Sequence, residues 1–440
     1  MQIVLLTMSL IISILYIRKI WRVNPIVLFI GALFFLEMIW QFVSIVWLDN
    51  GAYISEQIRY SYFTGASFRY TILILPFAIL YPWFLNRDIK RNQTMTIRFK
   101  INQGSVLGRG DSLVIMALII IYLVIDVICS GNIPLFSGIN MGTYYLKYSK
   151  FPLCSFLQDY ILPFISLLLG ASAGRCKRDK IRTKKYFGVF ALVVLLQILL
   201  NCKFYGLYDY ILQFILAYAV ASGFGEHETK KKIPIRYIVF GIIFLGSILF
   251  ICITKYSNSV INPVQYLLDR VFSLQSHTFW GVDMLIQKKQ LSADYAGFWH
   301  EVLQGVISDV SRLNPDYGIA RVMYMVTVDT YAGDMLKSGY LFAGSYITVL
   351  ISYLGYVPVF FVSIVLAWVT SKFSFLMYEC IKYRNGIVLF FSFFVFKRFY
   401  EYFRVGNLAM IINWKFIIIY IVYACMWIGQ KSVYKNKLRG

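Results

Sequence analysis

The chain has 440 residues, of which 59% are hydrophobic, 18% aromatic and only 15% charged, and its formal net charge is +22. Soluble domains carry about 25% charged residues, whereas runs of roughly 18 or more apolar residues recur along this chain, so an ordinary soluble domain is excluded. Runs such as VFALVVLLQILL (189–200) also lack the alternation of a transmembrane β-barrel. The composition predicts an all-α polytopic integral membrane protein.

We expect about eleven transmembrane helices. In chain order they cover about 2–17, 25–48, 64–85, 113–129, 153–174, 186–202, 207–224, 236–254, 341–371, 387–403 and 408–428. The first is expected to be a retained span, because its basic residues follow it and no small-residue cleavage site is present. Three regions result: helices one to eight at 1–254, a large loop at 255–340, and the last three helices with a tail at 341–440.

Lysine and arginine concentrate in alternate loops, which predicts the orientation. One set of loops contains RKIWR (18–22), NRDIKRNQTMTIRFK (86–100), RCKRDKIRTKK (175–185), KKKIPIR (230–236), KYR (382–384) and KSVYKNKLRG (431–440). By the positive-inside rule this set is cytoplasmic, so the N-terminus lies outside and the C-terminus inside. The net positive charge is thus explained by control of the membrane topology and by contact with anionic lipids. We therefore expect no nucleic-acid partner.

The seven cysteines lie in or beside apolar spans, and none falls in the longest polar loop. This distribution argues against a disulfide framework and against a Cys/His zinc site. We therefore expect no metal site.

The orientation makes 255–340 an outside loop long enough to form a structure of its own. Its first part, 264–290, is predicted to be an amphipathic helix on which Arg270 and His277 share a face, since residues seven apart differ by about 20°. Phe272, Phe279 and Trp280 on this helix are expected at the membrane interface. The stretch 298–321 and a further helix from about 317 follow.

Several ionisable residues fall at membrane depth, where they usually mark a water-filled cavity or an internal pair. They are Glu37, Arg69, Asp126, Lys397, Arg398, Glu401, Arg404 and Lys415. Lys397, Glu401 and Arg404 share one helix face, either as a self-neutralising stripe or as a cationic wall for an anionic ligand. Arg69 is expected to reach toward the outer interface.

Motifs for nucleotide binding and for common hydrolases are absent. The chain has no GxxxxGK[ST], GxGxxG, HExxH or GxSxG. An ATP-driven pump and a zinc protease are therefore disfavoured, and any chemistry should use an energy source already in the membrane.

The segment RVFSLQSHTFWGVD (270–283) resembles a segment of the Wzy-type polymerases, which join O-antigen or capsule repeat units in bacteria. The resemblance rests on Arg270, Gln275, Phe279 and Trp280, and on the Gly- and Tyr-rich run at 317–356. The number of spans and the single large outside loop also fit. The resemblance implies a glycosyltransferase of the inner membrane that needs no cofactor.

Such an enzyme transfers a sugar chain from undecaprenyl diphosphate to an incoming lipid-linked repeat unit on the periplasmic side. Its expected partners are undecaprenyl-diphosphate-linked oligosaccharide, membrane lipids and, as a further candidate, a chain-length regulator protein. The activated sugar–diphosphate bond supplies the energy, which agrees with the missing nucleotide motifs.

This reaction needs cations for the diphosphate and a base for the acceptor hydroxyl. We nominate Arg270 for the diphosphate, because the guanidinium fork suits phosphate. Further nominated substrate-binding residues are Gln275, Trp280, Arg321, Arg398 and Arg404. Trp280 either stacks on a sugar ring or anchors its helix in the interface.

His277 is the candidate base, because it shares a face with Arg270 and titrates near neutral pH. Asp283 and His300 are the alternatives.

Two other classes of function stay open at this stage. A flippase or transporter of lipid-linked oligosaccharide would also have many spans, although the internal repeats common in transporters are not evident. An O-antigen ligase uses the same donor with a different acceptor. The sequence separates ligase from polymerase poorly.

Overall fold

The structure is a computed structural model and describes residues 2–96, 111–139, 141–201, 204–224, 268–307, 313–383 and 386–437. Within these ranges the chain is almost entirely helical, and the sheet they contain is one antiparallel hairpin, β1 (Tyr53–Ile54) and β2 (Arg59–Tyr60). The predicted all-α class is confirmed for this part of the chain. The predicted span at 236–254, the basic run at 230–236 and the loop residues 255–267 lie outside the described residues.

The helices before the large loop follow the predicted spans closely. They are α1 (Gln2–Val23), α2 (Pro25–Ile30), α3 (Ala32–Leu48), α4 (Ala66–Thr96), α5 (Asp111–Cys129), α6 (Pro134–Ser137), α7 (Met141–Lys147), α8 (Cys154–Phe156), the π-helix η1 (Leu157–Ile161), α9 (Leu162–Arg178), α10 (Lys184–Leu199) and α11 (Phe204–Ala221).

The second half contains short helices and then long ones. The elements are the π-helix η2 (Asp269–Ser273), α14 (His277–Gln287), α15 (Tyr295–Ile307), α16 (Gly318–Val326), α17 (Asp329–Lys337), α18 (Tyr346–Leu354), α19 (Tyr356–Tyr383), α20 (Gly386–Val405), α21 (Ala409–Ile412) and α22 (Trp414–Lys437).

Four helices among the described residues are long and apolar enough to cross a membrane: Val4–Val23, Ala66–Arg91, Cys154–Arg178 and Tyr356–Lys382. Shorter apolar helices occupy Ala32–Leu48, Leu113–Cys129, Asp209–Ala221 and Trp414–Cys425. These helices are compatible with a multi-pass membrane protein. The predicted count of about eleven spans is not confirmed by them.

Several predicted helices are interrupted in the structure: the span predicted at 25–48 divides into α2 and α3, and the one at 408–428 into α21 and α22. Two further interruptions follow. The span predicted at 341–371 is divided at Gly355, whose φ of +74° is a backbone conformation that suits glycine, so α19 begins only at Tyr356. The amphipathic helix predicted at 264–290 ends with η2 and restarts as α14. At this second break Gln275 Nε2 donates to the Arg270 carbonyl, 3.0 Å away, and thereby satisfies a backbone group at the helix end.

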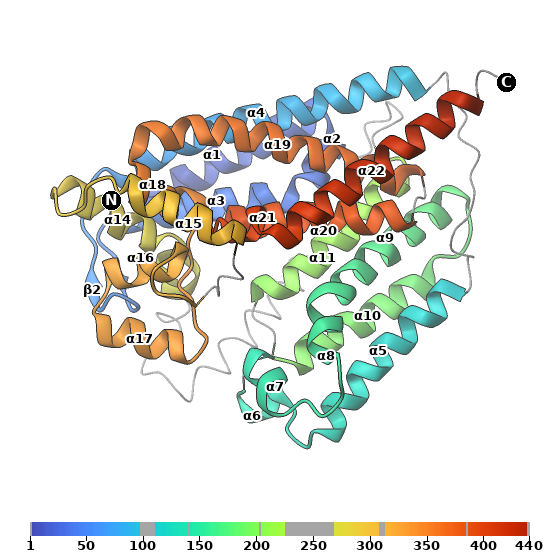
Figure 1. Ribbon diagram of the computed structural model, residues 1–440, viewed down its shortest axis with the longest axis horizontal. Coiled ribbons are helices and arrows are strands. Elements are labelled where there is room, and N and C mark those ends of the chain that lie inside the picture. Colours follow the sequence, from blue (N-terminus) through green and yellow to red (C-terminus); the bar gives the residue numbers. More distant parts are fainter. Residues whose placement is uncertain are drawn as a thin grey trace.

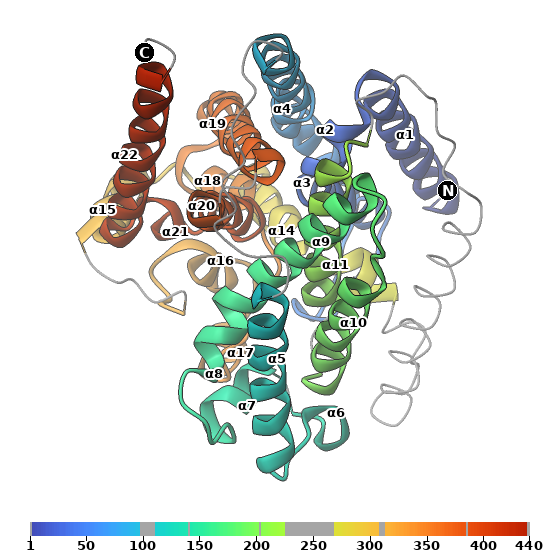
Figure 2. The same ribbon diagram turned by 90° about the vertical axis from the view of Figure 1, so that its right-hand side faces the viewer.

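The long helices run side by side, and the short elements β1, β2 and α14 to α18 gather at one end of the bundle together with the N-terminus (Figure 1). The C-terminus lies at the opposite end. Figure 2 shows α5 and α8 to α11 as a second group of helices beside α1, α4 and α19. The buried side chains form two clusters, and α9 and α11 contribute residues to both.

Basic segments that are far apart in sequence meet at the C-terminal end. Lys372 Nζ lies 2.6 Å from Asp88 Oδ2, which joins α19 to the charged end of α4. Arg175 at the end of α9 donates to the Ile381 carbonyl, 2.9 Å away, and Asn24 donates to Asn86 at 3.0 Å. The positively charged runs around these contacts therefore share one end of the bundle, as a common membrane side requires.

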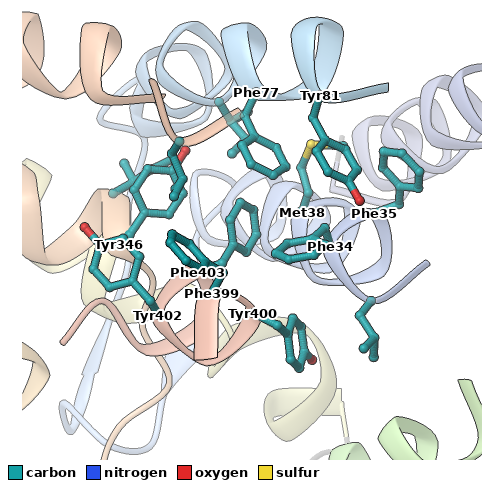
Figure 3. Close-up of a cluster of buried hydrophobic side chains, with 14 of the residues drawn as sticks. Phe34, Phe35, Met38, Phe77, Tyr81, Tyr346, Phe399, Tyr400, Tyr402 and Phe403 are labelled. Carbon is teal, nitrogen blue, oxygen red and sulfur yellow. The ribbon is translucent and has the colours of Figure 1, made fainter. Parts of the chain in front are cut away.

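The core between α3, α4 and α20 is built around Phe34 (Figure 3). Its ring centroid lies 5.4–5.9 Å from those of Phe77, Tyr81, Phe396, Tyr400 and Phe403. Most of these rings meet edge to face, the geometry that aromatic quadrupoles favour. The packing fixes α3 against α4, and so fixes the loop between them that carries the candidate site.

Close packing also joins α9 to α11. Gly170 and Gly174 are four residues apart on α9, and a side chain at either would collide with the α11 backbone at Phe214 or Tyr218. Small residues at this spacing let two membrane helices approach closely.

Candidate functional site

The loop between α3 and α4 folds over η2 and α14, which follow more than 200 residues later in the sequence. Trp40 Nε1 donates to the Val271 carbonyl at 2.6 Å, and Ser276 Oγ donates to the Gln41 carbonyl at 3.0 Å. Gln57 Nε2 donates to the His277 carbonyl at 2.9 Å. These bonds tie the predicted functional segment to α3 and to the loop after it, neither of which the sequence connected with that segment.

The contacts bring together five polar side chains, which we call the Glu56 cluster: Glu56, Asp269, Arg270, His277 and Tyr340. Tyr340 donates its hydroxyl hydrogen to Glu56 Oε1 at 2.8 Å, and Arg270 Nη1 donates to the Tyr340 oxygen at 2.6 Å. Arg270 Nη1 also lies 3.8 Å from Glu56 Oε1. The Arg270 side chain is 40% exposed, whereas that of Glu56 is 7% exposed, so Arg270 faces outward more than the carboxylate that it contacts.

His277 contacts Glu56 from the buried side. Its Nε2 lies 3.1 Å from Glu56 Oε2, and its Nδ1 lies 2.9 Å from the Leu274 carbonyl oxygen. The side chain has no exposed surface. Arg270 and His277 both contact Glu56, but they do so across a helix break and not from one face of a single helix, so the predicted shared face is wrong.

Charges set the protonation of this cluster. Burial raises the pKa of the Glu56 carboxyl, but His277, the Tyr340 hydroxyl and the Arg270 guanidinium together outweigh it, so the pKa is lowered below its ordinary value. Burial raises the pKa of Asp269, although Ser55 Oγ donates to its carboxylate at 2.5 Å. Burial and the nearby Glu56 charge raise the pKa of Tyr340.

The cluster also holds buried polar atoms without aligned hydrogen bonds. Glu56 Oε2, His277 Nε2 and Asp269 Oδ1 are three such atoms. Buried polar groups are almost always paired, and an exception points to strain, catalysis or an unseen ligand. Two of these atoms, Glu56 Oε2 and His277 Nε2, lie 3.1 Å apart and face each other, and the Glu56 cluster is the candidate functional site.

Asp283 forms a separate pair with Arg69. Arg69 donates from Nε to Oδ1 at 2.7 Å and from Nη2 to Oδ2 at 2.6 Å, and Tyr356 donates to Oδ1 at 2.7 Å. The Asp283 side chain has no exposed surface. Arg69, expected to reach toward the interface, instead fastens α4 to α14, and Asp283 has its acceptor sites occupied.

Trp280 has neither of its two predicted roles. It is fully buried, donates to the Tyr62 carbonyl at 3.2 Å and contacts that ring edge to face. Phe279 is 1% exposed. These aromatic side chains fill the core, because Tyr62 in the loop after α3 packs against Trp280 and Tyr70 on α4 packs against Phe279. Their predicted interfacial position is therefore wrong.

Arg321 lies in a different set of contacts, near the start of α15. Its guanidinium carbon is 4.0 Å from the centroid of the Tyr353 ring, and Nη2 is 3.0 Å from Asp294 Oδ2. His300 on α15 lies 3.2 Å from the Tyr317 hydroxyl. Neither residue has a contact with the Glu56 cluster among those described.

The other nominated arginines lie on α20. Arg398 is enclosed by the Phe394, Phe416 and Tyr160 rings and donates to Glu401 Oε2 at 2.8 Å. Lys397 lies 4.0 Å from the same carboxylate, and Arg404 lies over the Tyr400 ring. These contacts match the self-neutralising stripe, one of the two interpretations that the sequence allowed.

Sequence reasoning missed Glu56 and Tyr340. Glu56 stands in ISEQIRY (54–60), a polar stretch between two apolar helices, which was the available signal. Its partners follow some 220 residues later, so no local pattern links them. Among the described residues, no group of three or more His, Cys, Asp or Glu side chains is arranged to hold a metal ion.

Comparisons with known proteins give one match. Residues 314–420 match the model of a family of unknown function, DUF6418, a region that includes α16 to α21 and the first part of α22. No curated protein and no solved structure matches the chain.

Proposed function

We propose that the protein polymerises undecaprenyl-diphosphate-linked oligosaccharide repeat units into O-antigen or capsular polysaccharide, on the periplasmic side of the bacterial inner membrane. The observation that carries the proposal is the Glu56 cluster, in which the half-exposed Arg270, from the segment that resembles the Wzy-type polymerases, meets the buried Glu56 carboxylate from the loop before α4.

The orientation supports this assignment. The Glu56 cluster lies in the loops before α4 and before α18, at the end of the bundle opposite the shared basic end (Figure 1). If the basic end faces the cytoplasm, as the positive-inside rule predicts, the cluster and the N-terminus face the periplasm. Lipid-linked sugars are polymerised on that side, where no nucleotide is available.

Arg270 serves as the ligand of the leaving diphosphate. Its guanidinium presents a planar fork of donors and bears a permanent positive charge. The contacts to Tyr340 and Glu56 hold it near the outer surface before the substrate binds. As the sugar–phosphate bond breaks, negative charge grows on the diphosphate oxygens, and a preorganised cation stabilises that charge most.

Glu56 accepts the proton of the acceptor hydroxyl. The acceptor oxygen forms a bond to the anomeric carbon, the bond from that carbon to the diphosphate oxygen breaks, and undecaprenyl diphosphate leaves. Glu56 is ionised at neutral pH because its pKa is lowered.

His277 acts through Glu56 rather than on the substrate, which changes the role expected from its sequence position. The ring is fully buried, and both of its nitrogens face acceptor oxygens, the Leu274 carbonyl and the Glu56 carboxylate. A ring in this position orients the carboxylate.

A surface-polysaccharide gel tests the function. We compare a gene deletion with the strain complemented by the intact chain, by Arg270→Ala and by Lys289→Ala, an exposed cation in the turn after α14. The deletion and Arg270→Ala should lose the ladder and leave core carrying a single repeat unit, and Lys289→Ala should restore the ladder.

Bare core without any repeat unit would overturn the proposal, since it indicates loss of ligation or export. A full ladder in the deletion would exclude polymerisation of this polysaccharide. A full ladder from well-expressed Arg270→Ala would leave polymerisation standing and refute the Glu56 cluster as its site.

A further inference from the structure

The second feature of interest is α15, which lies within the predicted outside loop but has an apolar exposed face. Tyr295, Trp299, Leu303 and Ile307 are 56%, 61%, 58% and 72% exposed. They follow one another at intervals of four residues and so form a stripe along one side of the helix. We call these four residues the α15 stripe.

Charge is missing from this face of α15. Glu301 is the only acidic residue in the helix, which has no Lys or Arg, and it is 1% exposed and accepts a hydrogen bond from the Gly318 amide at 3.0 Å. The exposed charges Lys288 and Lys289 come before the helix begins. A helix facing water would normally turn charged side chains outward. Here the charged side chain is turned inward and the large apolar ones outward.

The opposite face of α15 packs against α18, α21 and α22. Gly305 approaches the α21 backbone so closely that an added Cβ would lie 3.3 Å from Ala409 Cα. Figures 1 and 2 both place α15 beside the junction of α21 and α22, on the outside of the bundle. Exposed apolar residues on α22, including Ile418 and Ile421, continue the same kind of surface.

We propose that α15 is a re-entrant or interfacial helix whose stripe contacts the acyl chains of the outer leaflet. The helix has 13 residues and is therefore about 20 Å long, too short to cross a hydrocarbon core of about 30 Å. Tyr295 and Trp299 occupy its first half, where aromatic side chains suit the headgroup level. The inference is independent of the proposed enzymatic function.

The occupant is lipid rather than a second protein, because α15 packs against α22, whose apolar part Trp414–Cys425 also exposes large apolar side chains such as Ile418 and Ile421. The predicted outside loop is therefore not wholly in water. It dips into the bilayer between the Glu56 cluster and α22.

Spin labels on the full-length chain test this inference. Leu303→Cys is compared with Lys289→Cys as the aqueous control and with Ile421→Cys as the lipid control, in a background whose seven native cysteines are alanine. The protein is reconstituted into phospholipid vesicles. The collision rates of each label with oxygen, which concentrates in lipid, and with a water-soluble nickel chelate are then measured.

The Leu303→Cys label should match the Ile421→Cys label, with an oxygen-to-nickel ratio severalfold higher than that of the Lys289→Cys label. A ratio equal to that of Lys289→Cys would place α15 in water and overturn the inference. An immobilised label shielded from both reagents would also overturn it, because a protein partner would then cover the stripe. If Leu303→Cys does not fold, the same comparison with Ile307→Cys decides between these outcomes.

Discussion

The pair between Arg69 and Asp283 gives the sharpest prediction of stability. Asp283 is fully buried and accepts two hydrogen bonds from the Arg69 guanidinium and one from Tyr356. Replacing Arg69 by alanine leaves a buried carboxylate with one remaining donor among these contacts. The loss should loosen the contact between α4 and α14, on which the geometry of the Glu56 cluster depends.

Removing one partner of a buried ion pair costs about 3–5 kcal/mol. The Arg69 side chain is 25% exposed, so water screens part of the interaction. We therefore expect about 3 kcal/mol, the lower end of that range. A free-energy change of this size lowers the ratio of folded to unfolded protein roughly a hundredfold.

The measurement is thermal unfolding of the purified full-length protein in detergent. Arg69→Ala should lower the unfolding midpoint clearly, whereas Lys337→Ala should leave it unchanged, because Lys337 and its partner Asp334 are both mostly exposed. The double variant Arg69→Ala with Asp283→Ala should lose less than the sum of the single variants, because it no longer leaves a buried unpaired charge.

A midpoint for Arg69→Ala equal to that of Lys337→Ala would refute the reasoning. Full additivity in the double variant would show that the two side chains do not interact.

Three further predictions concern the Glu56 cluster and one turn. Arg270→Lys keeps the positive charge but loses the guanidinium fork. Polymerisation in a purified assay should slow roughly tenfold to a hundredfold, which corresponds to the loss of one charge-assisted hydrogen bond. An unchanged rate would exclude Arg270 as the diphosphate ligand. Folding lowers the pKa of Glu56, so the ionised carboxylate adds stability above about pH 4.5, and this stability is lost as the pH falls through the lowered pKa. Glu56→Gln should therefore flatten this part of the acid-unfolding curve. An unaltered curve would show that the pKa of Glu56 is not lowered by folding. Gly318 and Gly339 both have positive φ, but only at Gly318 would a Cβ collide with a neighbouring side chain, that of Asn407. Gly318→Ala should therefore lower the unfolding midpoint more than Gly339→Ala, for which backbone strain alone costs about 1–2 kcal/mol; equal losses would show that this packing is unimportant.

The sequence by itself determined the class of the protein and most of its helices. Apolar runs of sufficient length predict membrane helices, because backbone groups in lipid must be satisfied within the segment. The grouping of basic residues in alternate loops also predicted that these segments share one end of the bundle. The contacts of Asp88 with Lys372 and of Arg175 with Ile381 agree with that prediction.

Helix interruptions were harder to predict from the sequence. Gly355 lies inside a run that reads as one continuous apolar helix, and glycine is tolerated in membrane helices. The positive φ of Gly355 separates α18 from α19, and α18 packs against α14 and α16. This packing is a feature of the tertiary structure and leaves no local pattern in the sequence.

The Glu56 cluster was decided by tertiary structure. The sequence pointed to Arg270 and His277 through local spacing and family resemblance, but it gave no sign that a carboxylate from the loop before α4 stands between them. Pairing across more than 200 residues leaves no periodic signal, since each partner looks like an ordinary polar loop residue in its own neighbourhood. The burial of Trp280 and of Glu301 could not be predicted from the sequence for the same reason. Neighbouring segments decide which face of a short helix is covered, and these segments come together only when the chain folds.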